Sequence, residues 1–215
     1  MWWGWPWRKA FFLRIRWFRF VLVGYVVLSF LAVYPVLGDS PLSSCSIPTS
    51  GSATITSDCI LYNEIVVEDK LNVTGVPDAQ GNLPKISGGG SNRLFKVESG
   101  GELVVRSLNL TGGYTASQGG ALHLTDSSAH FYTILFHNNE ARTGGAVYSK
   151  ISNFTCNSCS FRRNTGYYCG GIYAESGIVL LSKSLFETNL ATIAPNRLDN
   201  DMYLFNSAAS ATLIN

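Results

Sequence analysis

Apolar and polar positions recur along this chain with a period of about 25 residues. One column of the repeat is aromatic and consists of Phe136, Phe161 and Phe186. An asparagine follows each of them three residues later, at Asn139, Asn164 and Asn189. An aliphatic column keeps the same register and consists of Val97, Leu122, Val147, Ile172 and, after a five-residue insertion near Pro195, Met202. Three columns in one register indicate a structural repeat.

Within each repeat the apolar residues are spaced by two, as strands require, and no stretch keeps a helical period. Such short strands bury little alone, but stacked repeats share a continuous core. The chain is therefore predicted to be all-β, a right-handed parallel β-helix whose aliphatic and phenylalanine columns point inward. The asparagines are predicted to occupy left-handed bends and to hydrogen-bond from coil to coil. Gly144 and Gly145 are predicted to form a bend between two strands.

The sequence predicts three segments. Residues 1–38 hold basic residues and then an uncharged apolar run over 20–37, the order of a cleaved signal peptide or of an uncleaved membrane anchor. Either alternative makes the remainder secreted or displayed at the cell surface. Residues 39–75 are predicted to cap the first coil, and 76–215 to form the β-helix repeats. The repeats stop about one residue before the next phenylalanine position, so the β-helix is expected to be truncated at its C-terminus.

Five cysteines in an exported chain predict disulfide bonds with one cysteine left over. Cys45 and Cys59 flank a short polar loop and are predicted to pair. Two of Cys156, Cys159 and Cys169, which fall in one repeat, are expected to form a second bond. A metal site at the same three cysteines lacks a fourth ligand.

Enzymatic cleavage of a polysaccharide needs carboxylates a few ångströms apart, so in a β-helix acids should share a column. The acids of the regular repeats instead face bases: Glu175 lies over Lys150, Glu187 over Arg162 and Glu98 under His123. These alternating charges predict exposed ion pairs of small energy. No catalytic residue, metal site or cofactor is predicted.

Two groups remain as secondary candidates. Asp199 and Asp201 lie two residues apart beside the insertion and are a weak candidate for an acidic site. The alternative is that they belong to a simple polar turn. His123, His130 and His137 are spaced by seven, but no histidine recurs in the next repeat and no acid or cysteine completes a site.

A binding face is predicted from strand alternation. If the aliphatic column points inward, the residue after each member points outward. The resulting outward column is His123, Tyr148, Tyr173 and Tyr203. Rings of this kind on a flat sheet suit a polysaccharide or a surface protein. The alternative is that tyrosine merely fills a half-buried β surface.

Three N-x-Thr sequons begin at Asn72, Asn109 and Asn153. They are predicted glycosylation sites if the source is eukaryotic and carry no meaning in a bacterium.

The charge pattern gives no support for nucleic-acid binding, and no nucleic-acid partner is predicted. The chain has a formal net charge of +2 and 14% charged residues, but its basic excess lies in the first 19 residues. The remainder is slightly acidic, whereas nucleic-acid binding needs a basic surface.

The segments "FHNNEARTGGAVY", "FRRNTGYYCGGIY" and "GGALHL" resemble the FxxN and GGA[ILV] repeats of the polymorphic outer-membrane protein family. The stretch from Leu71 through "PKISGGGSNRLFKVESGGELVVRSLNLTGG" looks like the lead-in to repeats in large exported pectin-lyase-like proteins. The resemblance covers roughly residues 55–205 and implies an exported, surface-associated β-helix, often an adhesin. This chain lacks that family's C-terminal barrel, so the resemblance does not extend to self-export.

The sequence therefore predicts a non-catalytic exported β-helix module, structural or adhesive, that binds polysaccharide or protein. The alternative is a fragment of a polysaccharide lyase or hydrolase whose catalytic coils are missing. Fold alone does not decide between them.

Overall fold

The structure is a computed structural model that describes residues 42–193 and 200–214. The described residues form nineteen β-strands and no helix, so they include no helix able to cross a membrane. The predicted signal or anchor over 1–38, its apolar run over 20–37, and Asp199 lie outside the described residues. The prediction of an all-β chain is confirmed for the described part.

Fifteen strands form one large sheet. They are β1 (Ser43–Ser44), β2 (Gly51–Ile55), β3 (Cys59–Ile60), β4 (Ile65–Val67), β5 (Lys70–Gly75), β6 (Lys85–Ser87), β7 (Phe95–Val97), β8 (Glu102–Thr111), β10 (Leu122–Thr125), β11 (Ser128–His137), β13 (Val147–Asn157), β14 (Ser160–Arg162), β16 (Ile172–Ser182), β17 (Leu185–Glu187) and β19 (Met202–Ile214). A four-stranded sheet holds β9 (Tyr114–Gln118), β12 (Glu140–Thr143), β15 (Thr165–Gly166) and β18 (Leu190–Ala191).

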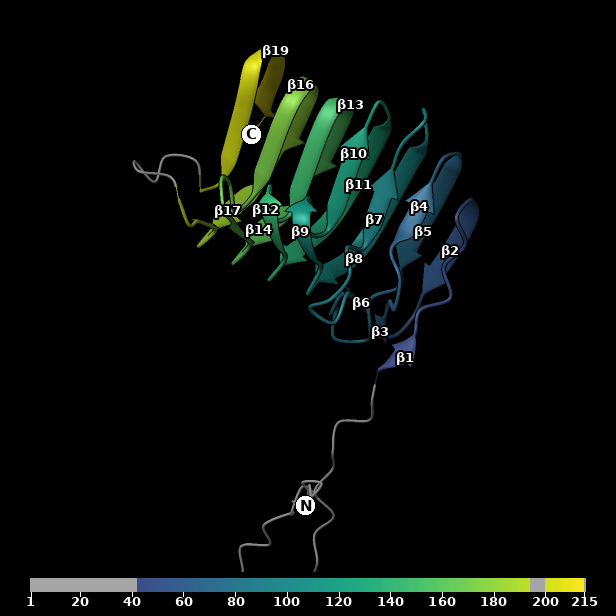
Figure 1. Cartoon of the computed structure of the whole chain (residues 1–215). Coiled ribbons are helices and arrows are strands. Elements are labelled where there is room, and N and C mark those ends of the chain that lie inside the picture. The colour runs from purple at the N-terminus through teal and green to yellow at the C-terminus, as the bar shows by residue number, and fades with distance from the viewer. Residues whose placement is uncertain (1–41, 194–199, 215) are drawn as a thin grey trace, which may run out of the picture. The chain divides into compact units, whose positions relative to one another are not determined.

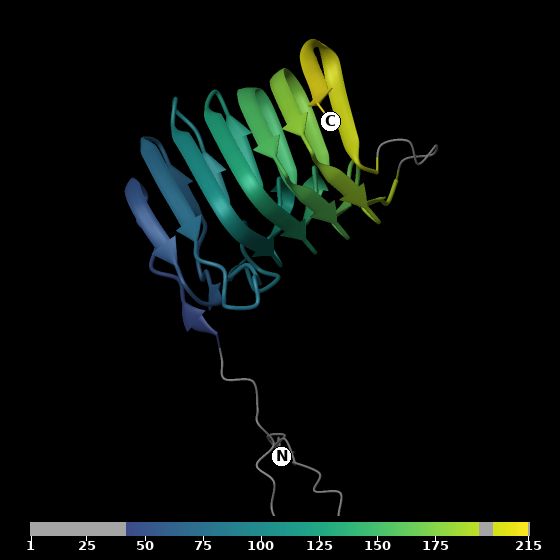
Figure 2. The same cartoon turned by 180° about the vertical axis from the view of Figure 1, so that it is seen from behind.

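Every strand pair in both sheets is parallel. Each strand pairs with the strand at the same place in the next repeat, so repeats lie side by side (Figures 1 and 2). Val147 is paired with Leu122 on one side and with Ile172 on the other. The 25-residue period of the sequence is therefore the pairing register of the sheet.

The assignment of Val97 to the predicted aliphatic column is wrong. Leu122 pairs with Phe95, and Val97 pairs with Leu124. The preceding repeat is longer by two residues, because it has one extra residue in the turn before Leu103 and one in a bulge of β9. For the same reason His123 lies beside Lys96 rather than over Glu98.

Sharp bends between strands occur at residues with positive φ that recur at the repeat spacing. The first set is Ser107, Thr133, Ser158 and Lys183, the second is Asp126, Ile151 and Ser176, and the third is Asn138, Arg163 and Thr188. A single left-handed residue bends the chain without a loop, at a cost of about 1–2 kcal/mol for a residue with a side chain. The prediction that the asparagine column occupies these bends is wrong, because the residue before each asparagine does so.

The core lies on the inward faces of the strands. Burial alternates at the start of β11 as the spacing of two predicts: Ala129 and Phe131 are fully buried, whereas their neighbours are half-buried or exposed. The phenylalanine column is stacked ring on ring: Phe136 lies 4.7 Å from Phe161, and Phe161 lies 4.7 Å from Phe186. Such aromatic pairs stabilise by about 0.5–1.5 kcal/mol beyond the area they bury.

The asparagine column forms a buried hydrogen-bond ladder. Asn164 Nδ2 donates to Phe136 O at 3.0 Å and to Asn189 Oδ1 at 2.9 Å. Its Oδ1 accepts from the backbone N and the Nδ2 of Asn139, at 3.1 and 3.0 Å. At the end of the ladder Asn189 Nδ2 donates to Asp201 Oδ1 at 2.9 Å. The ladder supplies partners to the backbone groups that the bends remove from the sheet.

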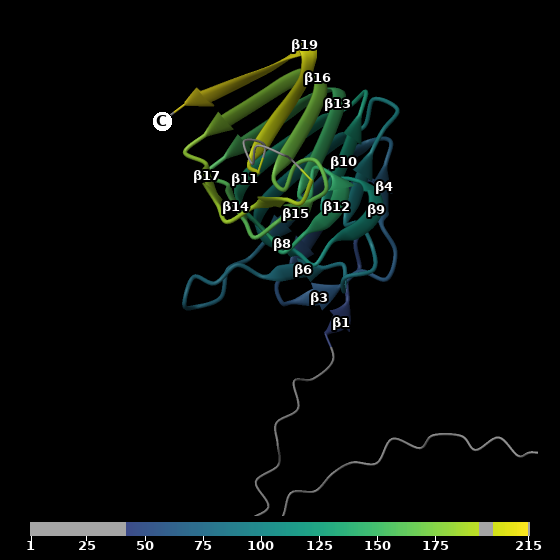
Figure 3. The same ribbon diagram turned by 60° about the vertical axis from the view of Figure 1, so that its left-hand side comes forward.

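The four-stranded sheet lies beside the large sheet (Figure 3). It leads into the glycine pairs of the repeat. Gly144 has a φ of +62°, and a side chain at Gly145 would collide with the carbonyl oxygen of Thr165 in the next repeat. The pair is therefore a bend that brings backbones of adjacent repeats into contact, as the sequence predicts.

Strands β1 to β5, within the segment predicted to be a cap, pair into the large sheet. Disulfide bonds join Cys45 to Cys59 and Cys156 to Cys159, so the first pairing is the predicted one and the second selects among the three cysteines of its repeat. Cys169 belongs to neither bond; it is buried, and its Sγ donates to Ile172 O at 3.2 Å.

Asn164→Ala is expected to lower the free energy of unfolding by about 3 kcal/mol, because it leaves several buried hydrogen-bonding groups without a partner. Equilibrium urea unfolding measures the loss. Asn157→Ala, at an exposed asparagine at the end of β13, is the control and is expected to change stability by less than about 0.5 kcal/mol. Equal losses in the two variants would contradict a stabilising ladder.

Ile151→Asn is expected to raise the free energy of unfolding by about 0.5–1 kcal/mol. Ile151 is 60% exposed yet has a φ of +51°, which a β-branched residue adopts only under strain and asparagine tolerates. Ile178→Asn is the control, because Ile178 is 52% exposed in β16 without a positive φ. Urea unfolding that shows stabilisation by both substitutions, or by neither, would refute the assignment of strain to Ile151.

Candidate functional site

The predicted aromatic column is present on β10, β13, β16 and β19, and we term it the aromatic ladder: His123, Tyr148, Tyr173 and Tyr203. Its ring centroids are 5.2, 5.8 and 5.0 Å apart along the series. The ladder arises because the preceding residue on each strand faces the core, which turns these rings outward.

Outward direction does not make the whole ladder exposed. Tyr148 is only 1% exposed, so the prediction of an exposed ring at this position is wrong. The Gln118 side chain, from the end of β9, interacts with the Tyr148 hydroxyl, and the Tyr148 ring meets His123 edge to face and stacks on Tyr173. Coverage by a segment of the preceding repeat is a tertiary effect that strand alternation cannot predict.

The ladder becomes accessible towards β19. Tyr173 and Tyr203 are half-buried, and Phe205 is 46% exposed. The Phe205 ring lies 6.3 Å from Tyr173 and 6.4 Å from Tyr203. We term Tyr173, Tyr203 and Phe205 the open end of the ladder. It combines adjacent aromatic rings with partial exposure, and Phe205 is a member that the sequence pattern missed.

A polar row runs beside the rings. Tyr148 donates its hydroxyl hydrogen to Glu175 Oε2 at 2.6 Å, and Lys150 Nζ lies 3.1 Å from Glu175 Oε1. Burial, and then the bond to Glu175, raise the pKa of Tyr148 far above its ordinary value. The same hydroxyl bond, with help from Lys150, lowers the pKa of Glu175. Glu175 is therefore ionised and Tyr148 neutral around pH 7.

Burial also raises the pKa of Tyr173 to about 12, so its ring stays a neutral phenol around pH 7. Neutral rings beside a paired carboxylate can stack on and hydrogen-bond to a ligand, whereas acid–base catalysis needs a group that titrates near the working pH. Within the described residues no group of three or more His, Cys, Asp or Glu side chains is arranged to hold a metal ion.

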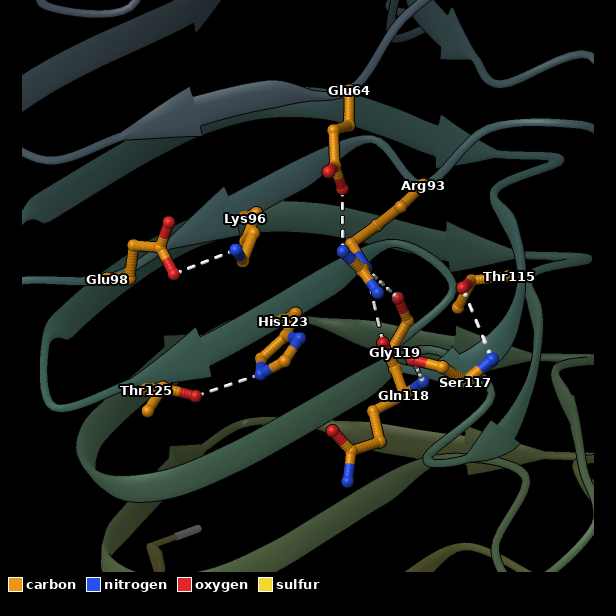
Figure 4. A network of polar contacts seen from close by, with 10 residues as sticks. All are labelled: Glu64, Arg93, Lys96, Glu98, Thr115, Ser117, Gln118, Gly119, His123 and Thr125. Atoms are coloured by element: carbon orange, nitrogen blue, oxygen red, sulfur yellow. Dashed lines mark hydrogen bonds and ion pairs between the residues drawn. The ribbon is translucent and has the colours of Figure 1, made fainter.

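His123 begins the ladder inside a polar network (Figure 4). Its Nε2 lies 2.8 Å from Thr125 Oγ1, and its buried Nδ1 has no hydrogen-bond partner. Nearby, Arg93 Nη1 donates to Glu64 Oε2 at 2.6 Å, and Lys96 Nζ lies 2.8 Å from Glu98 Oε2. Burial, with Arg93 and Lys96 adding positive charge, lowers the pKa of His123 from 6.5 to about 4.

The other predicted candidates do not join the ladder. His130 and His137 lie on other faces of the repeat; His130 Nδ1 is 2.7 Å from Thr155 Oγ1. Asp201 accepts from Asn189 and so ends the asparagine ladder. Ion pairs join Lys150 to Glu175 and Arg162 to Glu187 across adjacent strands, as the register predicts.

The three sequon asparagines differ in accessibility. Asn153 is exposed and Asn72 is half-buried. Asn109 is only 9% exposed within β8 and is the least accessible of the three, and glycosylation of these residues stays a prediction. Sequon spacing does not reveal that Asn109 shares a pocket with residues of the loop 76–84 or that its backbone N donates to Pro84 O at 3.0 Å.

Comparison with known proteins identifies no relative of this chain. No protein-family model matches the chain, and neither a curated protein nor a solved structure gives a match. The site is therefore interpreted from its own geometry.

His123 is expected to make folding pH-dependent. Its pKa falls from 6.5 to about 4 on folding, so between these values the unfolded chain binds a proton that the folded chain rejects. Stability is thus lost as the pH drops through this window. Thermal unfolding between pH 7 and about pH 4 is expected to show a smaller loss for His123→Gln than for the parent chain.

His130→Gln is the control for this measurement, since it removes a histidine whose ring is hydrogen-bonded on another face. It is expected to retain the parent pH dependence. An unchanged pH dependence in His123→Gln would show that the buried imidazole does not reject a proton.

Proposed function

We propose that the chain forms a right-handed parallel β-helix that acts as an exported, non-catalytic adhesive module for polysaccharides. The in-register parallel pairing of successive repeats and the recurring left-handed bends support the β-helix. A right-handed course follows the near-universal handedness of parallel strand crossovers. The two disulfide bonds support an oxidising, extracellular compartment.

The open end of the ladder is the observation that carries the proposed activity. Tyr173, Tyr203 and Phe205 present adjacent, partly exposed rings on a flat parallel sheet, with Glu175 and Lys150 beside them. Rings of this kind cover the apolar face of a sugar, and charged groups at the edge accept and donate hydrogen bonds to its hydroxyls. Repetition along the sheet suits a polymer better than a single small molecule.

A binding role without cleavage agrees with the chemistry of the face. Glu175 is engaged by both Tyr148 and Lys150, and the row beside the ladder places Lys150 and Phe205 on either side of it. Glycoside cleavage generally uses two carboxyl groups flanking one bond. We therefore propose no catalytic step for this face.

Attachment to a cell surface is part of the same proposal. It rests on the resemblance of the FxxN and GGA[ILV] segments to polymorphic outer-membrane proteins and on the apolar run over 20–37. Cleavage of that run would give a secreted form, and retention would give a membrane-anchored form.

Removal of an open-end ring is expected to weaken polysaccharide binding. Tyr173→Ala and Phe205→Ala are each expected to weaken retention on immobilised pectin or alginate by about tenfold, because each removes one stacking surface. Affinity electrophoresis or co-sedimentation of the exported chain measures retention. Tyr62→Ala, at a tyrosine that is 64% exposed elsewhere, is the control and is expected to bind as the parent does.

Two outcomes would overturn the proposal. One is that neither polymer retains the parent chain, or that Tyr62→Ala weakens retention as much as the two test substitutions. The other is release of new reducing or unsaturated ends during incubation, which would support the polysaccharide-cleaving alternative. Circular dichroism of each variant shows that it has kept its strand content.

A further inference from the structure

A polar pocket of about 520 Å³ lies on a part of the chain that the sequence pattern did not single out. Its lining comes from three successive repeats and includes Asn63, Glu64, Asn92, Arg93, Tyr114 and Thr115. The volume falls in the range of small-molecule sites. None of these residues belongs to the aromatic ladder.

Arg93 gives the pocket a fixed wall. Its side chain is only 9% exposed, and Nη1 donates to Glu64 Oε2 at 2.6 Å. Nε donates to the carbonyl oxygens of Gln118 and Gly119, at 3.2 and 3.0 Å (Figure 4). The guanidinium is thus held from both neighbouring repeats, so no side-chain freedom is left to lose when a ligand binds.

The same pair retains unused hydrogen-bonding capacity. Within the described residues Arg93 Nη2 and Glu64 Oε1 make no hydrogen bond, and both residues line the pocket. Asn92 Nδ2 donates to Leu61 O at 3.3 Å, which leaves its Oδ1 as an acceptor, and Asn63 adds a side-chain amide. Both donors and acceptors therefore line one recess.

An aromatic ring completes the lining. Tyr114, the first residue of β9, is 39% exposed, and its backbone N donates to Asn92 O at 2.9 Å. This bond fixes the backbone of Tyr114 beside Asn92, and the residue lines the pocket with part of its surface open to solvent. A ring surface beside paired donors and acceptors suits a ligand that is polar at its edge and apolar on its face.

We propose that this pocket binds a single neutral sugar unit, independently of the polymer-binding face. Adjacent hydroxyls of a sugar both donate and accept hydrogen bonds, which matches the Arg93–Glu64 pair, and a pyranose face matches Tyr114. The charges of the pocket favour a neutral sugar over a uronic acid. Glu64 already neutralises Arg93, so the carboxylate of a uronic acid would meet Glu64 without a free cation to offset the repulsion.

Binding of monosaccharides to the intact chain tests the site. Glucose, galactose, mannose and N-acetylglucosamine are titrated by ligand-observed NMR, each against glucuronic and galacturonic acid. At least one neutral sugar is expected to bind with millimolar affinity, and both uronic acids at least tenfold more weakly. Tyr114→Ala is expected to weaken neutral-sugar binding by about tenfold. Tyr132→Ala, at a tyrosine that is also 39% exposed, is the control and is expected to leave it unchanged.

A charge substitution separates ligand recognition from a purely structural role of the pair. In Glu64→Gln the guanidinium is no longer neutralised, so the preference is expected to reverse in favour of the uronic acids. Thermal unfolding checks that this variant is folded, and Tyr114→Ala tests the site without disturbing the ion pair.

Three results would overturn the proposal: no binding of any of the four neutral sugars, binding that Tyr114→Ala leaves intact, or a folded Glu64→Gln variant with unchanged preference. Loss of polymer retention in Tyr173→Ala with sugar binding intact would instead contradict neither site. The two proposals therefore fail separately.

Discussion

Parallel pairing of each repeat with the next, in one unbroken register, is the constraint on which the described structure depends. A single short strand of this chain has too little apolar surface to stay folded. In register, equivalent positions meet, so Phe136 stacks on Phe161 and Asn139 hydrogen-bonds to Asn164. A shift of one residue would turn every inward side chain outward. The same register therefore determines the core, the bends and the outer columns together.

The asparagine ladder explains how the bends are tolerated inside a buried stack. A left-handed residue such as Asn138 or Arg163 turns the chain without a loop but removes backbone groups from the strand pairing. The following asparagine, fully buried at Asn139 and Asn164, bonds to those groups and to its neighbour in the next repeat. The strain at the bend and the hydrogen bonds of the ladder thus belong to one local motif.

The outer surface is less regular than the core, and its irregularities create both proposed binding sites. Gln118, which follows the bulge of β9, interacts with the Tyr148 hydroxyl; this ring of the ladder is buried, and the open end lies further along. The early repeats contribute no strand to the four-stranded sheet, so β9 is its edge strand. Arg93 Nε, rather than a neighbouring strand, donates to the carbonyl oxygens of Gln118 and Gly119 at this edge. The polar pocket lies at the same edge.

The sequence by itself determined the strand periodicity, the pairing of Val147 with its neighbours, the stacked phenylalanines, the asparagine ladder and the ion pairs of the regular repeats. These follow from the alternation of apolar and polar residues within each strand and from the constant 25-residue spacing, both of which are visible in the sequence. Only the tertiary structure decided the register at Val97, the burial of Tyr148 and Asn109, and the contact of Arg93 with Glu64. Each depends on an insertion, a bulge or a loop that packs against another strand. Such contacts join residues that are far apart in the sequence, so residue spacing alone does not predict them.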